Sequence, residues 1–516
     1  MRFDLSGIDQ TMADSAAEFL NQSGYATETG GICIEWKCDP LAERLRVEYK
    51  DGTLLLYGRE RVHFYRGLTL FLSELIEYGD NCADFKKEEQ ISFRESGVML
   101  DCSRNGAANI RFLKRMIRFC ASCGLNQLYL YMEDMYEVPD YPYFGAWRGR
   151  FKHDELEEID RYGQKFGLEV IPAIQTLAHM HTYLRWPAAQ DLKDTDDILM
   201  VGSPKTYAFV EALIRNVSGC FSTKKIHVGM DEADFLGLGK YLRVHGYEDR
   251  YQIMTKHLNT VCSICKELSL EPMIWSDMFF RLKSPTGDYY DLSEETTFDE
   301  IFALPEGVEL VYWDYYHHDQ SDYEKNIRLH HKITDQLRFA AGGWTWNGIS
   351  PNYSKAEKTI AEGIMACRKQ GVDKAFCTFW FDNGAETPMQ TAWYPIAYFA
   401  QQCYSECAEE TDKMLRVMTG TGAAEYRLLD QFDNVSGTSA ENENADNPSK
   451  YVLYQDVLLG MFDAQIAESS LPYHYGKLAG ELYRQIGNVK NTDTEKLFSY
   501  YHTLAQYQFD CAVHRN

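Results

Sequence analysis

The segment KKIHVGMDE, residues 224–232, is an apolar run that ends on two adjacent carboxylates. Successive side chains of a strand point to opposite faces, so Ile226 and Val228 share one apolar face. Asp231 falls on the opposite face, and Glu232, beyond the expected strand end at Asp231, is free to lean toward the same space. Two carboxyl groups in this position predict a site at the carboxyl end of a parallel sheet.

Seven further strand-like runs accompany this segment from Gly97 onward, and amphipathic helical patterns mostly separate them. Several of these helical patterns end on a glycine, as helices with a left-handed C-cap do. Eight strands alternating with helices over about 300 residues predict a TIM (β/α)8 barrel. The weakest unit lies between the fifth and sixth strands, where residues 293–307 support only a short helix. The eight runs read GVMLDCSRN, LNQLYLYMED, LEVIPAIQT, KKIHVGMDE, EPMIWSDMF, VELVYWDYY, RFAAGGWTWN and DKAFCTFWFDNG.

Two flanking regions depart from this alternation. Residues 1–95 combine LRVEYKDGTLLLYG, whose DGT turn indicates a hairpin or adjoining strands, with a helical FYRGLTLFLSELIEYG, and so predict a small α/β domain. From residue 405 to 516 the pattern is helical, with a polar, exposed loop expected at 436–450. We therefore expect the barrel to occupy 96–404, between an N-terminal α/β domain and a C-terminal helical domain.

The composition narrows the choice of ligand and compartment. The chain has 77 Asp and Glu against 52 Lys and Arg, a formal charge of -25, which disfavours nucleic acid and anionic membranes as partners. We find no secretion leader and no run of ~18 uncharged apolar residues, so we expect a cytoplasmic protein without a membrane span. The 14 cysteines are scattered through apolar segments and predict reduced, buried thiols. We expect neither a cofactor nor a metal.

Tryptophans accompany the acidic residues at the predicted strand ends. Trp275, Trp313, Trp344, Trp346 and Trp380 all lie at or near these ends. A pyranose ring stacks its apolar face on Trp while its hydroxyl groups bond to polar side chains. An acid that protonates a leaving oxygen needs a raised pKa, which a neighbouring ionised carboxylate helps to produce. The combination favours glycoside hydrolysis over hydride or phosphoryl transfer.

Five motifs in barrel order give the chain a family resemblance. HVGMDE resembles the His-x-Gly-x-Asp-Glu signature of glycoside hydrolase family 20, the β-N-acetylhexosaminidases. DCSRNG, IQTLAHMH, YWDYY and WFDNGAE are similar to motifs of the bacterial intracellular branch of that family, and the resemblance covers roughly residues 1 to 400. It implies an exo-acting, retaining enzyme that releases terminal β-GlcNAc or β-GalNAc by substrate-assisted catalysis. Asp231 would orient the acetamido group and stabilise an oxazolinium intermediate, while Glu232 would act as the acid and base.

The resemblance also implies the residues that hold the sugar. Arg104 would bond the O3 and O4 hydroxyl groups, and Asp382 would bond O4 and O6, with Glu386 as its alternative or partner. Phe381 stands where the family motif leads us to expect a glycine. The substrate-binding residues that we predict are Arg104, His179, Trp275, Trp313, Tyr315, Trp346, Trp380, Asp382 and Glu386.

Two neighbours of the reacting acetamido group need separate assignment. The sixth-strand motif offers Tyr312, Tyr315 and Tyr316 as the hydroxyl that bonds the acetamido oxygen, and we favour Tyr315. His227 shares a strand face with Asp231, and we expect it to orient that carboxylate, although a structural role for this histidine is equally open.

Two other functions stay open. A non-catalytic sugar-binding barrel would keep the tryptophans but need not keep both acids. A metal-dependent barrel hydrolase would use Asp277, Asp314 and His317 as ligands, and a chelator would abolish its activity. We expect the substrate to be an oligosaccharide or glycoconjugate with a terminal N-acetylhexosamine. The linkage, the choice between GlcNAc and GalNAc, and a homodimer through the C-terminal helices stay open.

Overall fold

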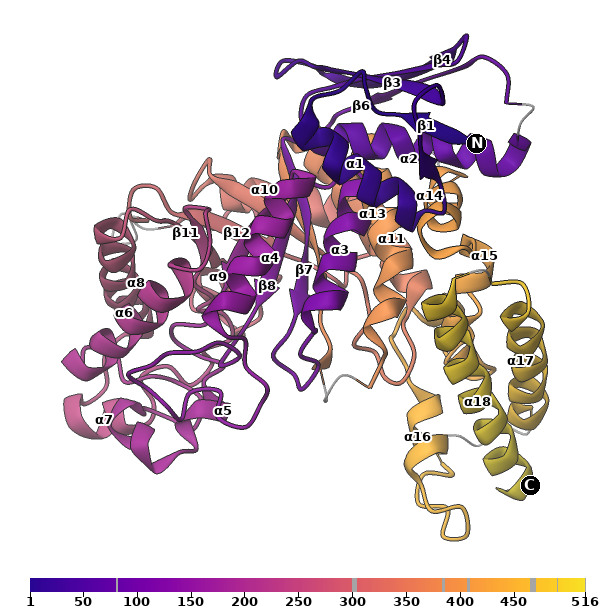
Figure 1. The fold of residues 1–516 in the computed structure, drawn as a ribbon. Coiled ribbons are helices and arrows are strands. Elements are labelled where there is room, and N and C mark those ends of the chain that lie inside the picture. Colours follow the sequence, from indigo (N-terminus) through magenta and orange to yellow (C-terminus); the bar gives the residue numbers. More distant parts are fainter. Residues whose placement is uncertain are drawn as a thin grey trace.

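The computed structural model describes residues 1–79, 82–298, 304–382, 386–405, 409–464, 470–489 and 491–515. Its centre is a closed barrel of eight parallel strands in the order β10-β11-β12-β13-β14-β7-β8-β9, which confirms the predicted TIM barrel (Figure 1). The strands are β7 (Glu95–Asp101), β8 (Gln127–Tyr131), β9 (Glu169–Ala173), β10 (Lys225–His227), β11 (Glu271–Trp275), β12 (Glu309–Trp313), β13 (Leu337–Gly342) and β14 (Lys374–Phe379).

Helices surround the barrel, and their ends follow the local sequence. α4 ends at Gly167 and α11 at Gly371, both in the left-handed conformation that glycine adopts without strain. Between β11 and β12 the described part of the chain contains only the five-residue α9; residues 299–303, within the segment where we expected a short helix, lie outside the described residues. The barrel helices are α3 (Ile110–Ser122), α4 (His153–Phe166), α5 (His181–Leu184), η2 (Pro187–Leu192), α6 (Pro204–Ser218), α7 (Lys240–His245), α8 (Arg250–Glu267), α9 (Asp277–Arg281), α10 (Gln320–His331), α11 (Tyr353–Gln370), η3 (Met389–Ala392) and α13 (Trp393–Tyr404).

The N-terminal region forms a six-stranded sheet in the order β2-β1-β3-β5-β4-β6, with α1 and α2 against it. The expected hairpin is present: β4 and β5 pair antiparallel across Asp51 and Gly52, whose φ values of 49° and 79° suit a tight two-residue turn. α2 lies between the sheet and the barrel, so it is buried on nearly every side (Figure 1). The elements are β1 (Arg2–Asp4), α1 (Gln10–Gln22), β2 (Ala26–Thr27), β3 (Ile32–Cys38), β4 (Arg44–Lys50), β5 (Thr53–Gly58), α2 (Arg61–Tyr78) and β6 (Phe85–Gln90).

The C-terminal region is helical, and α17 and α18 form an antiparallel pair beside the barrel (Figure 1). Tyr501 of α18 donates to the carbonyl of Ile349 at 3.1 Å, which ties this pair to the loop after β13. The elements are α14 (Glu409–Thr419), α15 (Ala423–Tyr426), η4 (Leu429–Phe432), η5 (Ala440–Asn442), α16 (Pro448–Tyr454), α17 (Leu471–Ile486) and α18 (Thr492–Arg515). We propose 1–95, 96–404 and 405–516 as the limits of the three regions. No described helix combines the length and apolarity needed to cross a bilayer.

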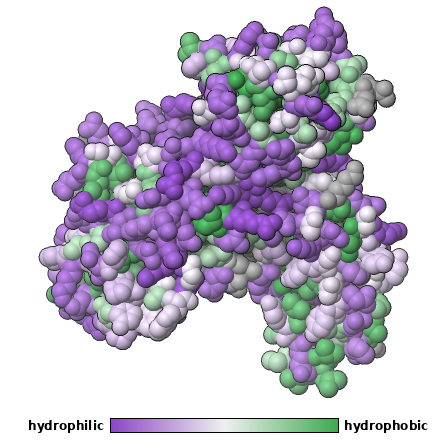
Figure 2. Space-filling view, viewed as in Figure 1, coloured by the Kyte–Doolittle hydropathy of each residue, from purple (hydrophilic) through white to green (hydrophobic). Residues whose placement is uncertain are grey.

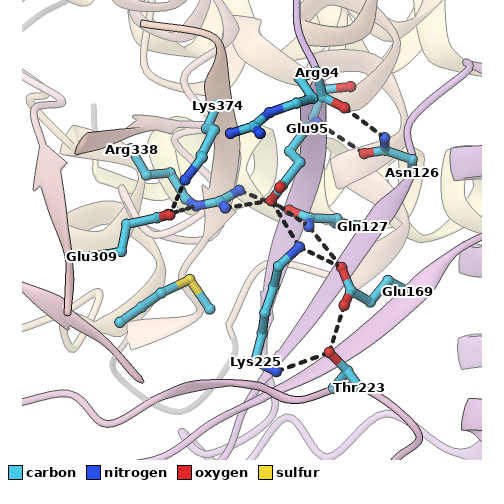
Figure 3. Close-up of polar contacts among 12 residues, drawn as sticks. Arg94, Glu95, Asn126, Gln127, Glu169, Thr223, Lys225, Glu309, Arg338 and Lys374 are labelled. Atoms are coloured by element: carbon cyan, nitrogen blue, oxygen red, sulfur yellow. Dashed lines mark hydrogen bonds and ion pairs between the residues drawn. The ribbon is translucent and has the colours of Figure 1, made fainter. Parts of the chain in front are cut away.

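A charged network fills the amino end of the barrel (Figure 3). Arg338 of β13 is fully buried and bonds to Glu95 at 2.5 Å, to Gln127 at 2.8 Å, and to Glu309. Lys225 of β10 bridges Glu95 at 3.0 Å and Glu169 at 2.9 Å. Seven of the eight strands, all but β11, contribute a polar residue from their first or second position, so these groups neutralise one another where the strands begin. The network closes the end of the barrel opposite the carboxyl ends of the strands.

Candidate active site

The chain turns sharply just before the two acids. β10 ends at His227, four residues earlier than the expected strand end at Asp231. The reason is the backbone: Gly229, Met230 and Glu232 have φ values of 73°, 75° and 48°, which no strand can hold. Both carboxyl groups therefore reach the pocket because of a left-handed turn, and strand alternation does not set their direction.

Gln175, at the end of the third barrel strand, fixes this turn. Its side-chain oxygen accepts from the backbone N–H of Met230 at 3.2 Å. Its nitrogen donates to Asp231 Oδ1 at 2.7 Å and to the Tyr131 hydroxyl at 2.9 Å. A Cβ at Gly229 would lie 2.0 Å from the same oxygen, so only glycine fits there. The sequence placed Gln175 at a strand end, but nothing local assigned it this role.

His179 forms an ion pair with Asp231. Its Nε2 lies 3.2 Å from Asp231 Oδ2 and 3.7 Å from Glu232 Oε2. Burial lowers the pKa of His179, but the charge of Asp231 outweighs burial and raises that pKa to about 10. Burial likewise raises the pKa of Asp231, but His179 and then Gln175 lower it to about 2. At neutral pH the pair is therefore an imidazolium beside a carboxylate.

Glu232 has the opposite character. Its side chain is about half exposed, and its backbone N–H donates to Asp277 Oδ2 at 3.0 Å. Burial and the negative charge of Asp231 raise its pKa, while His179 and Arg281 oppose that rise. The pKa of Asp231 is thus lowered and that of Glu232 is raised. A proton-donating acid beside a carboxylate that stays ionised usually shows this difference.

Aromatic rings form the walls of the pocket above these acids. Trp313 stacks on Tyr315 with centroids 5.3 Å apart, and Trp346 meets Tyr315 edge-on at 5.4 Å. Trp380 lies 6.1 Å from Trp275 on another wall. The pocket brings together all the predicted site residues except Glu386 and adds Tyr316. Its lining is Arg104, His179, Asp231, Glu232, Trp275, Trp313, Tyr315, Tyr316, Trp346, Trp380 and Asp382.

Arg104 is held in place by three carboxylates. Its guanidinium lies 3.2 Å from Asp101, 3.3 Å from Glu133 and 3.9 Å from Asp382. It also lies over the Trp380 ring, 5.3 Å from the centroid. Burial would lower the pKa of Arg104, but these carboxylates outweigh it, so the group stays charged. Asp101 lies in the first strand-like run of the sequence and Glu133 in the second, but the sequence assigned neither residue a role.

Two expectations from the sequence need correction, and one of the three tyrosines that the sequence offered lies elsewhere. Glu386 does not line the pocket, because its carboxylate is held by Lys450 and by the Tyr454 hydroxyl, both at 2.8 Å. His227 does not orient Asp231: its Nδ1 accepts from Gly229 N–H and its ring packs 4.4 Å from that of Trp275. Tyr312 donates its hydroxyl to Asp314 at 2.6 Å, away from the pocket lining.

The alternative metal site does not assemble in the described part of the chain. Asp314 bonds to His317 Nδ1 at 2.6 Å, whereas Asp277 bonds to Arg281 and to the backbone of Glu232. Among the described residues, three side chains do offer possible metal-ligand atoms within 4.8 Å of one another: His179, Asp231 and Glu232. The set proposed from the sequence forms no such group.

Comparison with known proteins identifies relatives of two parts of the chain. Residues 92–326 match the glycosyl hydrolase family 20 catalytic domain, and residues 424–507 match the glycoside hydrolase 20C C-terminal domain. Hexosaminidase D of Homo sapiens is 28% identical over 222 residues, which are 40% of this chain and 42% of the relative. Hexosaminidase D of Bos taurus is 26% identical over 251 residues, 46% of this chain and 65% of the relative. The similarity thus spans about half the length of these relatives.

Solved structures share the fold at low sequence identity. A Flavobacterium johnsoniae chitobiase superposes with a TM-score of 0.60 at 14% identity, covering 99% of this chain and 89% of that chain. An exo β-N-acetylglucosaminidase from Vibrio harveyi, in complex with N-acetylglucosamine, gives a TM-score of 0.60 at 12% identity over 83% of this chain and 74% of that chain. At these identities the likeness concerns the fold.

Proposed function

The chain belongs to glycosyl hydrolase family 20, and from this we propose that it is an exo-acting, retaining β-N-acetylhexosaminidase. It removes terminal, non-reducing β-GlcNAc or β-GalNAc from oligosaccharides or glycoconjugates. The observation that carries the proposal is the adjacent pair of acids in an aromatic pocket, with a lowered pKa at Asp231 and a raised pKa at Glu232. An enzyme of this family needs one carboxylate that stays charged and one that exchanges a proton.

The reaction proceeds in two steps. The acetamido oxygen of the sugar attacks the anomeric carbon while Glu232 gives its proton to the departing glycosidic oxygen, and an oxazolinium ion forms. Asp231 accepts the acetamido N–H and stabilises the positive ring, because its carboxylate is fixed by Gln175 and paired with His179. Glu232 then removes a proton from water, whose oxygen attacks the anomeric carbon. The two inversions leave the configuration unchanged.

The sugar is held by the remaining pocket residues. Arg104 and Asp382, 3.9 Å apart, suit the O3, O4 and O6 hydroxyl groups. Trp313 and Trp346 offer apolar surfaces to the ring, and Tyr315 or Tyr316 bonds the acetamido oxygen. Tyr315 is the more buried of the two tyrosines, which supports our choice of it.

We further propose a cytoplasmic location, since the chain's 14 dispersed cysteines suit a reducing compartment. A homodimer stays a prediction. It is supported by the exposed side chains of Leu458, Leu459 and Met461, just beyond α16. Figure 2 shows hydrophobic residues gathered over the C-terminal helices, while most of the barrel face in view is hydrophilic.

The experiment that tests the proposal is a panel of p-nitrophenyl glycosides, without added cofactor and with a chelator present. We expect turnover of the N-acetyl-β-glucosaminide and N-acetyl-β-galactosaminide, and none of the plain β-glucoside. Turnover of the glucoside without either N-acetyl substrate would refute the proposal. Binding without turnover would indicate the non-catalytic barrel, and inhibition by the chelator would indicate the metal-dependent hydrolase.

A further inference from the structure

Asp277 is a buried carboxylate that holds the backbone of the acid. It begins α9 and is fully buried. Its Oδ2 accepts from the backbone N–H of Glu232 at 3.0 Å and from Arg281 Nε at 3.2 Å. Among the described residues its Oδ1 has no hydrogen-bond partner. A carboxylate this deeply buried is costly, so its contacts with Glu232 and Arg281 must account for its presence.

Arg281 links the same carboxylate to the side chain of Glu232. It follows Asp277 by one helical turn, and its Nη2 lies 3.9 Å from Glu232 Oε1. Its side chain is 22% exposed, so water screens it only in part. Asp277 thus touches the backbone of Glu232, and the arginine that it orients approaches the carboxyl group.

The backbone of Glu232 needs such support. Its φ of 48° is a left-handed conformation that an ordinary side chain rarely adopts, and it persists only where the surroundings impose it. Gln175 holds the turn at Met230, two residues earlier, but it does not contact Glu232 in the described structure. The Glu232 carbonyl accepts from Asp234 N–H at 2.8 Å within the same loop, and Asp277 fixes the Glu232 N–H from outside that loop.

We propose that Asp277 and Arg281 are the positioning residues of the acid: Asp277 fixes the peptide of Glu232, and Arg281 holds the Oε1 side of its carboxyl group. The proposal rests on the proposed function. Arg281 stabilises the ionised form of Glu232, which the second step needs as a base, while Asp231 and burial favour the protonated form that the first step needs. The two opposing influences let one carboxyl group serve in both steps.

Several charged or titratable groups face Glu232, and they come from four elements. Asp231 and Asp234 lie on its own loop, and both raise its pKa. His179 lies on the loop after β9 and lowers it, but His179 is already paired with Asp231. Arg281 is likewise paired with Asp277, so each of the two cations is shared between Glu232 and a second carboxylate. The full set is Asp231, Asp234, His179, Asp277, Arg281 and Tyr316.

Arg281→Met and Arg281→Lys form a matched pair for the test, with kcat/KM for p-nitrophenyl N-acetyl-β-glucosaminide followed against pH. We assign the alkaline limb to loss of the proton from Glu232. Burial raises the pKa of Asp277 to about 7 as well, so the limb is also followed in Asp277→Asn, which removes this second titration. Removing the positive charge should raise that pKa and move the limb to higher pH by about one unit, the lower end of what a charge at this distance produces. The lysine variant keeps the charge and should leave the limb close to its original place. An unmoved limb in the methionine variant, or equal shifts in both, would overturn the proposal.

Two more measurements separate positioning from folding. Asp277→Asn keeps an oxygen that can accept from the Glu232 N–H, so this variant should retain most of kcat. Asp277→Ala should lower kcat by about 10²-fold, which is the lower range for loss of general acid catalysis, and should change KM little. In a Glu232→Gln background the limb due to Glu232 should be absent, and Arg281→Met should leave the remaining pH profile unchanged; a shift caused by Arg281→Met in that background contradicts action through Glu232. If the unmodified enzyme turns over no N-acetyl substrate, the proposed function fails; turnover with an unmoved limb refutes only the positioning role.

Discussion

Replacing Gly229 by alanine should both destabilise the protein and disable its pocket. Gly229 has φ of +73°, and an added Cβ would lie 2.0 Å from Gln175 Oε1 and 2.8 Å from the carbonyl oxygen of Ile174. The backbone carbonyl cannot move far, so the amide of Gln175 must turn away. It then loses its bonds to Met230 N–H and to Asp231 Oδ1.

The magnitude follows from these separate losses. An alanine in the left-handed conformation costs about 1–2 kcal/mol. Losing the bond to the ionised Asp231 costs about 1.5–3 kcal/mol, and losing the neutral bond to Met230 about 0.5–1.5 kcal/mol. The free energy of unfolding should therefore fall by about 3–6 kcal/mol. Turnover should fall by at least about 10²-fold, because a preorganised group at the reacting centre is no longer fixed.

Gly371 provides the matched control for backbone strain. Its φ is +76°, but nothing lies within 4 Å of an added Cβ, so Gly371→Ala introduces the strain without the collision. Urea unfolding should show a loss of about 1–2 kcal/mol for this variant, with turnover unchanged. The reasoning is refuted if Gly229→Ala costs no more than Gly371→Ala and keeps its activity.

Four more outcomes follow from the site and the barrel. Glu232→Gln should lose about 10²- to 10⁴-fold in rate on glycosides with poor leaving groups but less on activated aryl glycosides; equal losses would argue against its role as the acid. Calorimetry should show that a thiazoline analogue of the oxazolinium binds at least about 10²-fold more tightly than GlcNAc, and that Asp231→Asn weakens binding of the thiazoline. A 2-fluoro sugar trapped covalently on any carboxylate would refute the mechanism. Arg338→Met should lower the free energy of unfolding by about 3–5 kcal/mol in urea, because it removes the buried cation between Glu95 and Glu309 and leaves them, among the described residues, only Lys225 and Lys374 as cationic partners; a cost below 1 kcal/mol would show that the network is dispensable. The pKa of His179 is raised to about 10 from an ordinary 6.5, so the histidine stabilises the fold fully below pH 6.5 and progressively less as pH rises toward 10. The unfolding temperature of the unmodified protein should therefore fall over this pH range, and that of His179→Gln should not show this fall.

The sequence by itself determined the barrel and most of the pocket's membership. Alternating apolar runs and glycine stops at Gly167 and Gly371 are local signals, because strand pleating and helix termination depend on neighbouring residues. A closed parallel barrel then brings all its strand ends to one face. Residues as distant as Arg104 and Asp382 could therefore be expected on one face of the barrel, and the family resemblance implied that both bind the sugar.

Only the tertiary structure decided how the acids are held. Gln175 meets Asp231 across 56 residues, and Asp277 meets the backbone of Glu232 across 45, and neither contact leaves a periodic trace in the sequence. Glu386 was misplaced for the same reason, since its partner Lys450 comes from the C-terminal helices. Local patterns record which face a residue occupies. The direction of a carboxylate and its pKa depend on groups that folding brings within about 4 Å, where electrostatic and hydrogen-bonding energies become large.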